Sequence, residues 1–398
     1  MIERKEYLEF LKKLKDKQII KVITGIRRCG KSTLLDMYKD FLKNNGIEKT
    51  QIISINFEDP KNMIYDNWKE LYEAIDNKLL KDKMNYIFLD EIQKINEFEQ
   101  AVDGLYIKKN VDIYITGSNS YMLSSELATY LTGRYMEIHM MPLSFKEFYE
   151  GYQFNNENQA YQKYIEYGGF PYLLNLDNDE LLISNYLDGL YNTILMKDVV
   201  SKNKVTDVLI LESINNFLFD NIGQFVSINK ISNTLNSNNR NNSVNTVENY
   251  TKYILDSYLM YRVPRYDIRG KKLLKTNEKY YACDLGLRKQ ILGEIRDAGS
   301  ILENIIFLEL KRRDYEIYVG KNNDKEVDFV VKNKDGIKYI QVCLSARDPE
   351  TLKRELASLE TINNHYPKYL ITLDYDTLNH NGIRQISTLD FLLGRVEI

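Results

Sequence analysis

Short apolar runs alternate with longer segments of mixed polarity over the first 145 residues. Five such runs, rich in Ile, Tyr, Val and Phe, lie at 20–24, 51–57, 86–90, 112–116 and 135–139. The segments between them carry apolar residues at helical spacing. Because apolar runs of this kind are typical of strands covered on both faces, the pattern predicts a parallel α/β sheet between helical layers.

Residues 146–205 have a mostly helical pattern, interrupted by the sequence GGFP at 168–171. Ser144 followed by Glu147 is typical of a capping box, so a helix is expected to begin at residue 145. This segment fits a small helical lid after the sheet domain.

The pattern changes again over residues 206–275. A short apolar run at 225–231 leads into a helix, and a second helix is expected after residue 243. An apolar segment at 259–267 and the basic turn RGKK at 269–272 follow. This order predicts a winged helix with its second helix presented outward and a hairpin wing. The apolar face of the second helix is expected to contain Val247, Tyr250, Ile254 and Leu255.

Residues 276–398 contain two apolar runs, 326–331 and 337–342, joined by the turn sequence KDG at 334–336. With a preceding helix, this hairpin is similar to the core of restriction-endonuclease-like folds. In such folds, carboxylates and a lysine on the second strand hold Mg²⁺ and activate water. Here Glu303 and Asp328 are acidic, but the second strand carries Gln341 and Cys343. A degenerate nuclease scaffold reused for binding is therefore favoured over a working nuclease.

A glycine-rich sequence, GIRRCGKS at 25–32, lies between the first apolar run and a helix-forming segment. Glycine lets backbone N–H groups approach phosphate oxygens, and the N-terminus of the next helix adds positive potential. Lys31 is expected to reach the β- and γ-phosphates of a nucleoside triphosphate, and Ser32 to hold Mg²⁺. The residues expected around the phosphates are Gly25, Ile26, Arg27, Arg28, Cys29, Gly30, Lys31, Ser32 and Thr33.

A second motif ends the third apolar run with two acidic residues, Asp90 and Glu91. The carboxyl end of a parallel strand faces the ligand in folds of this type. Asp90 is expected to hold Mg²⁺, and Glu91 to orient or deprotonate the water that attacks the γ-phosphate. The second acid therefore predicts hydrolysis as well as binding.

Polar residues follow the fourth run, where Thr116, Ser118 and Asn119 are candidates to sense the γ-phosphate; Ser118 is included among the nucleotide contacts. The alternative is a capped turn, because Ser and Asn favour turns. Arg134 precedes the fifth run. It is a candidate catalytic arginine that completes a neighbouring subunit's site, and the alternative is a solvated arginine.

The composition of the chain limits which partners, location and cysteine chemistry are expected. The formal net charge is −3, so any DNA contact must come from a local basic face. No stretch reaches the roughly 18–20 apolar residues of a membrane span, and the charged start lacks a signal-peptide core. The expected location is the cytoplasm. The three cysteines are isolated and indicate neither a disulfide framework nor a zinc site.

Several longer phrases resemble one protein family. They are VITGIRRCGKSTLL, IFLDEIQKI, ITGSNS, LTGRYMEIHMMPLSFKEFYE, KYYACDLGLR and EVDFVV. Together they resemble the prokaryotic AAA-type ATPases of the archaeal-ATPase kind, related to the STAND class, which carry a C-terminal domain of unknown function. The resemblance covers nearly the whole chain. The resemblance implies ATP binding and hydrolysis, and it implies little about the substrate.

The sequence thus predicts four domains: an AAA-type P-loop core at 1–145, a helical lid at 146–205, a winged-helix-like domain at 206–275 and an endonuclease-like α/β domain at 276–398. The predicted function is an ATPase whose turnover drives a switch or motor acting on DNA or a protein partner, with homo-oligomerisation open. The alternatives are a nucleotide-regulated, non-catalytic regulator and an ATP-gated nuclease. The candidate DNA contacts are Asn241, Asn242, Asn245, Asn249, Lys252, Arg269, Lys271 and Lys272.

Overall fold

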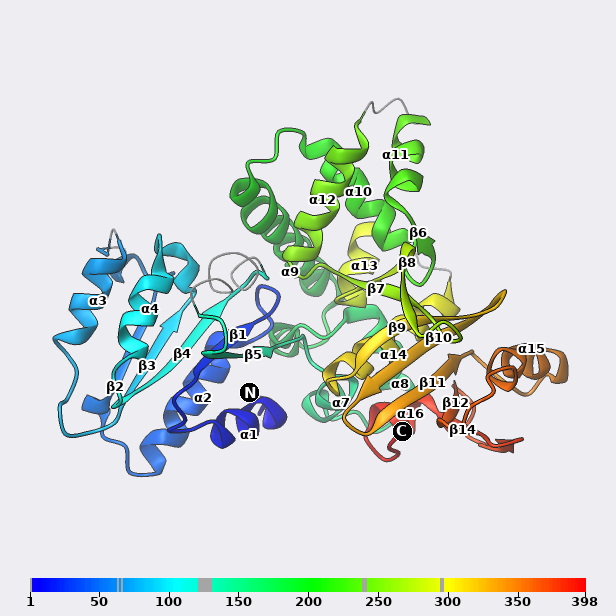
Figure 1. The fold of residues 1–398 in the computed structure, drawn as a ribbon, viewed down its shortest axis with the longest axis horizontal. Helices are drawn as coiled ribbons and strands as arrows, with labels where there is room; N and C mark the ends of the chain where they lie inside the picture. Colours follow the sequence, from blue (N-terminus) through cyan, green and yellow to red (C-terminus); the bar gives the residue numbers. More distant parts are fainter. Residues whose placement is uncertain (1, 63, 66, 121–130, 238–241, 294–296) are drawn as a thin grey trace. The chain divides into compact units, whose positions relative to one another are not determined.

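The computed structural model describes the chain except for residues 1, 63, 66, 121–130, 238–241 and 294–296 (Figure 1). It divides into two compact units. The first contains Met1–Pro142 and Asp256–Tyr258, and the second contains Leu143–Leu255 and Leu259–Ile398. Among the described helices, none is both long and apolar enough to cross a bilayer. The predicted domain boundary at residue 275 falls inside a strand of the second unit.

The first unit contains a five-stranded, all-parallel sheet in the order β2-β3-β4-β1-β5. Each of the five predicted apolar runs forms one of these strands, with ends shifted by at most one residue. The elements are α1 (Lys5–Lys13), β1 (Ile20–Thr24), α2 (Lys31–Asn44), β2 (Ile52–Asn56), α3 (Trp68–Asp76), β3 (Asn85–Asp90), α4 (Phe98–Tyr106), β4 (Val111–Gly117) and β5 (Tyr135–His139).

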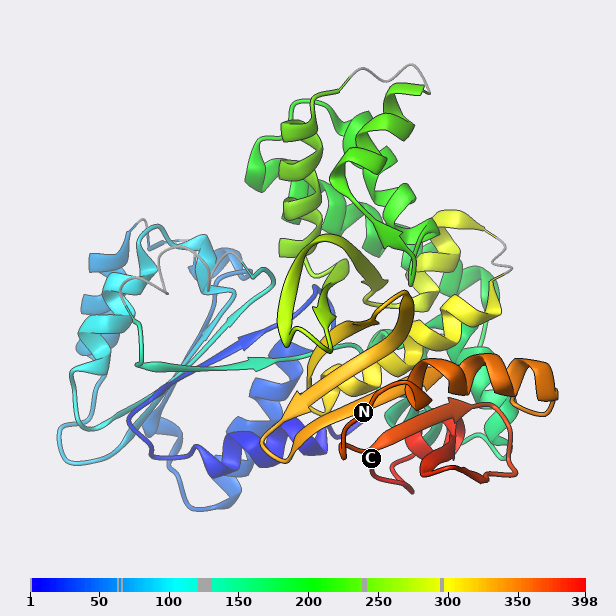
Figure 2. The same cartoon turned by 45° about the vertical axis from the view of Figure 1, so that its right-hand side comes forward.

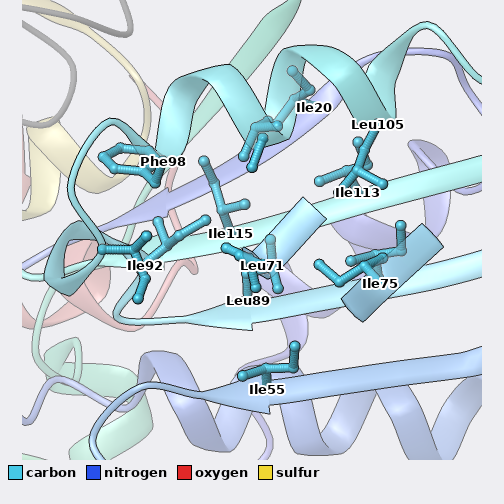
Figure 3. Close-up of a cluster of buried hydrophobic side chains, with 14 of the residues drawn as sticks. Ile20, Ile55, Leu71, Ile75, Leu89, Ile92, Phe98, Leu105, Ile113 and Ile115 are labelled. Carbon is cyan, nitrogen blue, oxygen red and sulfur yellow. The ribbon is translucent and has the colours of Figure 1, made fainter. Parts of the chain in front are cut away.

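Helices cover both faces of this sheet, as the apolar runs predicted. On one face, aliphatic side chains of the strands pack against α3 and α4. The helices contribute Leu71 and Ile75 from α3 and Leu105 from α4 (Figure 3). On the other face, the ring of Tyr38 from α2 lies 5.0 Å from the ring of Tyr114 in β4, measured between centroids. Because all five strands are parallel, their carboxyl ends lie together at one edge of the sheet.

The second unit begins with helices and continues into a large mixed sheet. Helix α7 starts at the predicted residue, because the Ser144 hydroxyl accepts from the Glu147 N–H at 3.1 Å and the Glu147 carboxylate accepts from the Ser144 N–H at 2.8 Å. The helical elements are α7 (Phe145–Tyr152), α8 (Glu157–Tyr167), α9 (Glu180–Thr193), the π-helical continuation Ile194–Ser201, α10 (Val208–Asp220), α11 (Ile228–Ser237), α12 (Val244–Asp256), α13 (Leu285–Leu292), α14 (Ala298–Arg312), α15 (Pro349–Glu360) and α16 (Thr388–Leu392).

The sheet of the second unit has nine strands in the order β13-β14-β12-β11-β10-β9-β7-β8-β6. Strands β10 and β11 form the antiparallel hairpin that the sequence predicted. Strand β7 pairs with β8 in an antiparallel hairpin and with β9 in parallel. One sheet therefore runs through both of the predicted C-terminal domains (Figure 2). The strands are β6 (Phe225–Val226), β7 (Met260–Asp267), β8 (Lys272–Ala282), β9 (Glu316–Asn322), β10 (Lys325–Asn333), β11 (Gly336–Val342), β12 (Lys368–Thr372), β13 (Asn379–His380) and β14 (Ile383–Ser387).

Candidate nucleotide-binding site

The glycine-rich loop connects β1 to α2 at the carboxyl edge of the parallel sheet. Gly25 has φ +143°, and a Cβ atom there would lie 2.0 Å from the Met140 carbonyl oxygen. Gly30 has φ +107° and caps the N-terminus of α2. Both positions therefore require glycine, one for close approach and the other for its backbone conformation. The loop presents the positive end of a 14-residue helix, which favours an anion.

The Lys31 ammonium lies inside this loop, with only 4% of the residue exposed. It donates to the carbonyl oxygens of Gly25 at 3.0 Å and Ile26 at 3.3 Å. It also forms an ion pair with the Glu91 carboxylate at 3.6 Å. All three partners are oxygen acceptors, so phosphate oxygens of a bound nucleotide can replace them without a change in the chemistry of the contact.

Ser32 and Asp90 meet through a hydrogen bond between their side chains. The Asp90 carboxylate also accepts from the Thr116 hydroxyl at 2.5 Å and the Asn56 amide at 3.0 Å. Burial raises the pKa of the Asp90 carboxyl, and the hydrogen bonds from Thr116 and Ser32 oppose that shift. A hydroxyl beside an anchored carboxylate is the kind of oxygen donor pair that Mg²⁺ prefers, so these residues fit the metal.

Glu91 follows directly and has a left-handed backbone, with φ +55° and ψ +46°. A residue other than glycine adopts this conformation at some cost in free energy. Its N–H donates to the Thr116 hydroxyl at 2.9 Å, and its carboxylate accepts from the Gln93 amide at 2.5 Å. Thr116, Asp90 and Glu91 are thus held as one cluster. Neither Gln93 nor Asn56 belongs to a recognisable sequence motif, so the sequence alone could not have identified them as part of the site.

The remaining predicted contacts differ in how close they lie to this cluster. Ser118 is buried and accepts from the Gln93 amide at 3.5 Å, a long contact. Cys29 is fully buried, and burial raises the pKa of its thiol. Arg27 pairs with Glu58 at 3.0 Å. Arg28 is exposed and has φ +66°.

Arg134 lies at the opposite edge of the sheet from the loop. It precedes β5, which runs parallel to β1 with Tyr135 beside Ile20, whereas the loop follows the other end of β1. A five-residue strand spans about 16 Å, so Arg134 does not reach the phosphate site of its own chain. Its guanidinium pairs with Asp103 and lies over the Tyr106 ring. Two roles fit this position: a solvated arginine that pairs with Asp103, or a group that enters another subunit's site.

A second group of ionisable residues lies on strands β8 and β10 of the nine-stranded sheet and on helix α14. The Lys279 ammonium on β8 contacts the carboxylates of Glu303 at 2.8 Å and Glu326 at 2.5 Å. Burial raises the pKa of the Asp328 carboxyl well above its usual range, and the neighbouring charge of Glu303 adds to the shift. Asp328 accepts from the Val342 N–H at 2.8 Å. Nowhere in the described residues do three or more His, Cys, Asp or Glu side chains form a group suited to a metal.

The exposed face of α12 carries polar residues. Asn245, Glu248, Asn249 and Lys252 are exposed, whereas Val247, Tyr250 and Ile254 are buried as predicted. Leu255, also predicted on the apolar face, is only partly buried. The Asn242 side chain is engaged in its own turn, where it contacts Ser232 at 2.9 Å and Asn236 at 3.0 Å. Asn241 lies outside the described residues. The hairpin turn between β7 and β8 exposes Arg269, Lys271 and Lys272.

The similarity of the chain to known proteins agrees with a phosphate-binding loop at residues 25–32. Residues 17–149 match the family model of an AAA domain, and residues 158–297 match a domain of unknown function. An uncharacterized protein of Haemophilus influenzae is 40% identical over 400 residues, covering 99% of each chain. An uncharacterized protein of Methanocaldococcus jannaschii is 31% identical over 394 residues, covering 93% of this chain and 85% of that protein.

Among solved structures, a Walker-type ATPase of Pyrococcus abyssi is similar in fold. It has a TM-score of 0.52 at 14% identity, and the match covers 73% of this chain and 96% of that structure. The parallel sheet, the phosphate loop and the sequence relatives lead to the same assignment. The chain belongs to the AAA-domain family of P-loop ATPases that includes the Haemophilus and Methanocaldococcus relatives.

Proposed function

We propose that the chain binds ATP with Mg²⁺ at the phosphate loop and hydrolyses it, and that turnover switches or moves the second unit on DNA or a protein partner. The observation that carries this proposal is the cluster in which Lys31 pairs with Glu91 while Thr116 holds both Asp90 and the Glu91 backbone. A binding site alone does not require the second, separately anchored acid.

The same cluster suggests how binding leads to catalysis. When phosphate oxygens take the place of its present acceptors, Lys31 leaves the Glu91 carboxylate. Glu91 is then free to accept a proton from a water molecule, while the Gln93 amide at 2.5 Å keeps it oriented. When bound, Mg²⁺ supplies charge neutralisation on the phosphates. Thr116 links Asp90 to Glu91 and supports a role for the β4 tip in sensing the nucleotide.

The second unit supports DNA as a candidate partner. Helices α10, α11 and α12, the short strand β6 and the hairpin β7–β8 follow one another in the order of a winged helix. Asn245, Asn249 and Lys252 lie on the exposed face of α12, and amide and ammonium groups are suited to adenine edges and phosphates. Glu248 on the same face opposes phosphate, so a protein partner is the alternative.

The experiment that tests this proposal is steady-state ATP hydrolysis with and without double-stranded DNA at low and high salt. Stimulation by DNA that weakens at high salt would support a motor or switch acting on DNA. Equal turnover with and without DNA would direct the proposal to a protein partner. Slow turnover under all conditions, together with tight ATP binding, would favour the non-catalytic regulator.

We further propose that Arg134 completes the active site of a neighbouring subunit. Arg134→Ala should then bind ATP normally but lose turnover by roughly a thousandfold or more, the size of effect seen for arginine fingers. Mixing it with Lys31→Ala protein should restore some hydrolysis, because each variant supplies what the other lacks. Hydrolysis by the single variants and by their mixture measures this.

Asp103→Asn is the matched control for Arg134. It removes the ion-pair partner of Arg134 but leaves the guanidinium in place. If Arg134 only stabilises α4 through Asp103, both variants should lose activity equally. Full turnover by a monomeric wild-type protein at high dilution would also contradict a shared active site.

We propose that the C-terminal part of the sheet is a nuclease-like scaffold without nuclease activity. The Lys279 ammonium supports this, because the charges of Glu303, Asp328 and Glu326 raise its pKa although burial lowers it. A resident cation therefore already lies among the acids that a metal would need. Cys343 stands where a catalytic lysine is expected, and burial raises the pKa of its thiol to about 12.

The purified protein should accordingly leave DNA uncut with Mg²⁺, Mn²⁺ or ATP present. Asp328→Ala should keep ATP turnover close to wild type and lower the free energy of unfolding by about 1 kcal/mol, because the partly buried Val342 N–H loses its acceptor. Gel assays and thermal unfolding measure the two effects. Metal-dependent cleavage that disappears in Asp328→Ala would overturn the scaffold proposal.

A further inference from the structure

The segment of chain that leaves the first unit packs directly against the phosphate loop. The Met140 N–H donates to the Thr24 carbonyl at 2.8 Å, immediately before the loop begins. The Met140 carbonyl lies so close to Gly25 that a Cβ atom at residue 25 would be 2.0 Å from it. A displacement of Gly25 should therefore also displace Met140.

The next residue, Met141, is held by the N-terminal helix. The guanidinium of Arg4 donates to the Met141 carbonyl at 2.8 Å and also to the Cys29 carbonyl of the loop at 2.9 Å. The Met141 N–H donates to the Tyr7 hydroxyl at 3.2 Å, and the Arg4 guanidinium lies over the Tyr7 ring. Arg4 is only 3% exposed. One buried cation thus joins the phosphate loop to the chain that leaves the unit.

Two residues further on, Leu143 is fixed within the second unit. Its N–H donates to the Gly169 carbonyl at 2.7 Å, and its carbonyl accepts from the Tyr164 hydroxyl at 2.9 Å and from Arg312 at 3.1 Å. The Gly169 N–H donates in turn to the buried Asp284 carboxylate at 2.6 Å. Leu143, Gly169 and Asp284 thus form a hydrogen-bonded node. It joins the sequences PLSF, GGFP and CDLGLR, none of which belongs to the nucleotide site.

We infer that Arg4 is a positioning residue of the phosphate loop and that residues 140–143 carry its displacement into the second unit. This inference rests on nucleotide binding at the loop, as proposed above. Pro142 stands between the two anchored ends, and its fixed φ and missing N–H make the connection stiff. Because each end is hydrogen-bonded within its own unit, closure of the loop around phosphates strains the Leu143–Gly169–Asp284 node.

Amide hydrogen exchange on the full chain tests this inference, with a non-hydrolysable ATP analogue as the probe. In wild-type protein, saturating analogue should change the exchange rates of the Leu143 and Gly169 N–H groups. Arg4→Ala should weaken analogue binding roughly tenfold, the effect of losing a charge-assisted hydrogen bond. At saturation the variant should keep the change within the loop and lose it at Leu143 and Gly169.

Two further variants separate positioning from stability. Arg4→Lys keeps the charge but reaches one carbonyl instead of two, so it should be intermediate in both affinity and exchange. Tyr114→Phe removes the hydrogen bond that the Tyr114 hydroxyl donates to Asp112 and the one it shares with the Tyr38 hydroxyl, away from the loop. It should lower the thermal stability but leave the exchange response intact.

The outcomes distinguish this inference from the proposal on which it depends. If the wild-type protein binds no analogue, the nucleotide-binding proposal fails. If it binds analogue without a change at Leu143 and Gly169, or if Arg4→Ala retains that change at saturation, the role given to Arg4 and to residues 140–143 is wrong. Loss of the response in Tyr114→Phe as well would also contradict it, because the response would then follow stability.

Discussion

Lys31→Ala should lose most of its affinity for ATP. The ammonium lies inside the phosphate loop and is the group placed there to meet the β- and γ-phosphates. Each charge-assisted contact to a phosphate oxygen contributes about 1.5–3 kcal/mol, so the dissociation constant should rise roughly a hundredfold or more. Titration calorimetry with ATP and Mg²⁺ measures the effect, and hydrolysis should disappear with it.

Lys43→Ala is the matched control, because Lys43 belongs to the same helix but pairs with Asp40 on the solvent side at 2.9 Å. Its affinity for ATP should equal that of the wild type. Unchanged ATP affinity in Lys31→Ala would mean that the loop between β1 and α2 is not the phosphate site.

Glu91→Gln should bind ATP as tightly as wild type, or more tightly, and hydrolyse it poorly. Lys31 pairs with Glu91 at 3.6 Å, and a neutral amide at residue 91 would compete less with phosphate for the lysine. The same amide cannot accept a proton from water, and loss of a general base costs roughly 10²–10⁴ in rate. Calorimetry and phosphate release measured on one preparation separate the two effects.

Glu97→Gln serves as its control, because Glu97 is an exposed glutamate that precedes α4 in the same region. It should hydrolyse ATP at the wild-type rate. If Glu91→Gln also turns over at the wild-type rate, another residue activates the water and the assignment of the catalytic acid is wrong.

The local parts of the fold could be predicted because their signals are local. The five parallel strands, the loop before α2 and the capping box at Ser144 and Glu147 each depend on residues within a few positions of one another. The acids at the end of β3 could be placed beside the loop because parallel strands end at the same edge of a sheet. Thr116 was among three candidates, and its hydroxyl joins the site through Asp90.

The residues that sequence reasoning missed act across long separations. Arg4 contacts Cys29 and Met141, 25 and 137 residues away, and a single arginine before a charged helix gives no pattern. Lys279 reaches the acidic cluster from β8, whereas the predicted lysine position was on β11. The pairing of β7 with β9 joins residues far apart in the chain, such as Arg265 and Val319, and no local pattern in the sequence predicts it.

The central claim is that this chain turns over ATP at the site formed by Lys31, Asp90 and Glu91. The most direct test is the formation of ADP and phosphate by purified wild-type protein with Mg²⁺, compared with the same protein in EDTA and with Glu91→Gln. We predict turnover in Mg²⁺, none in EDTA and little in the variant. Absence of ATP binding at millimolar nucleotide, or equal product formation in all three samples, would contradict the account.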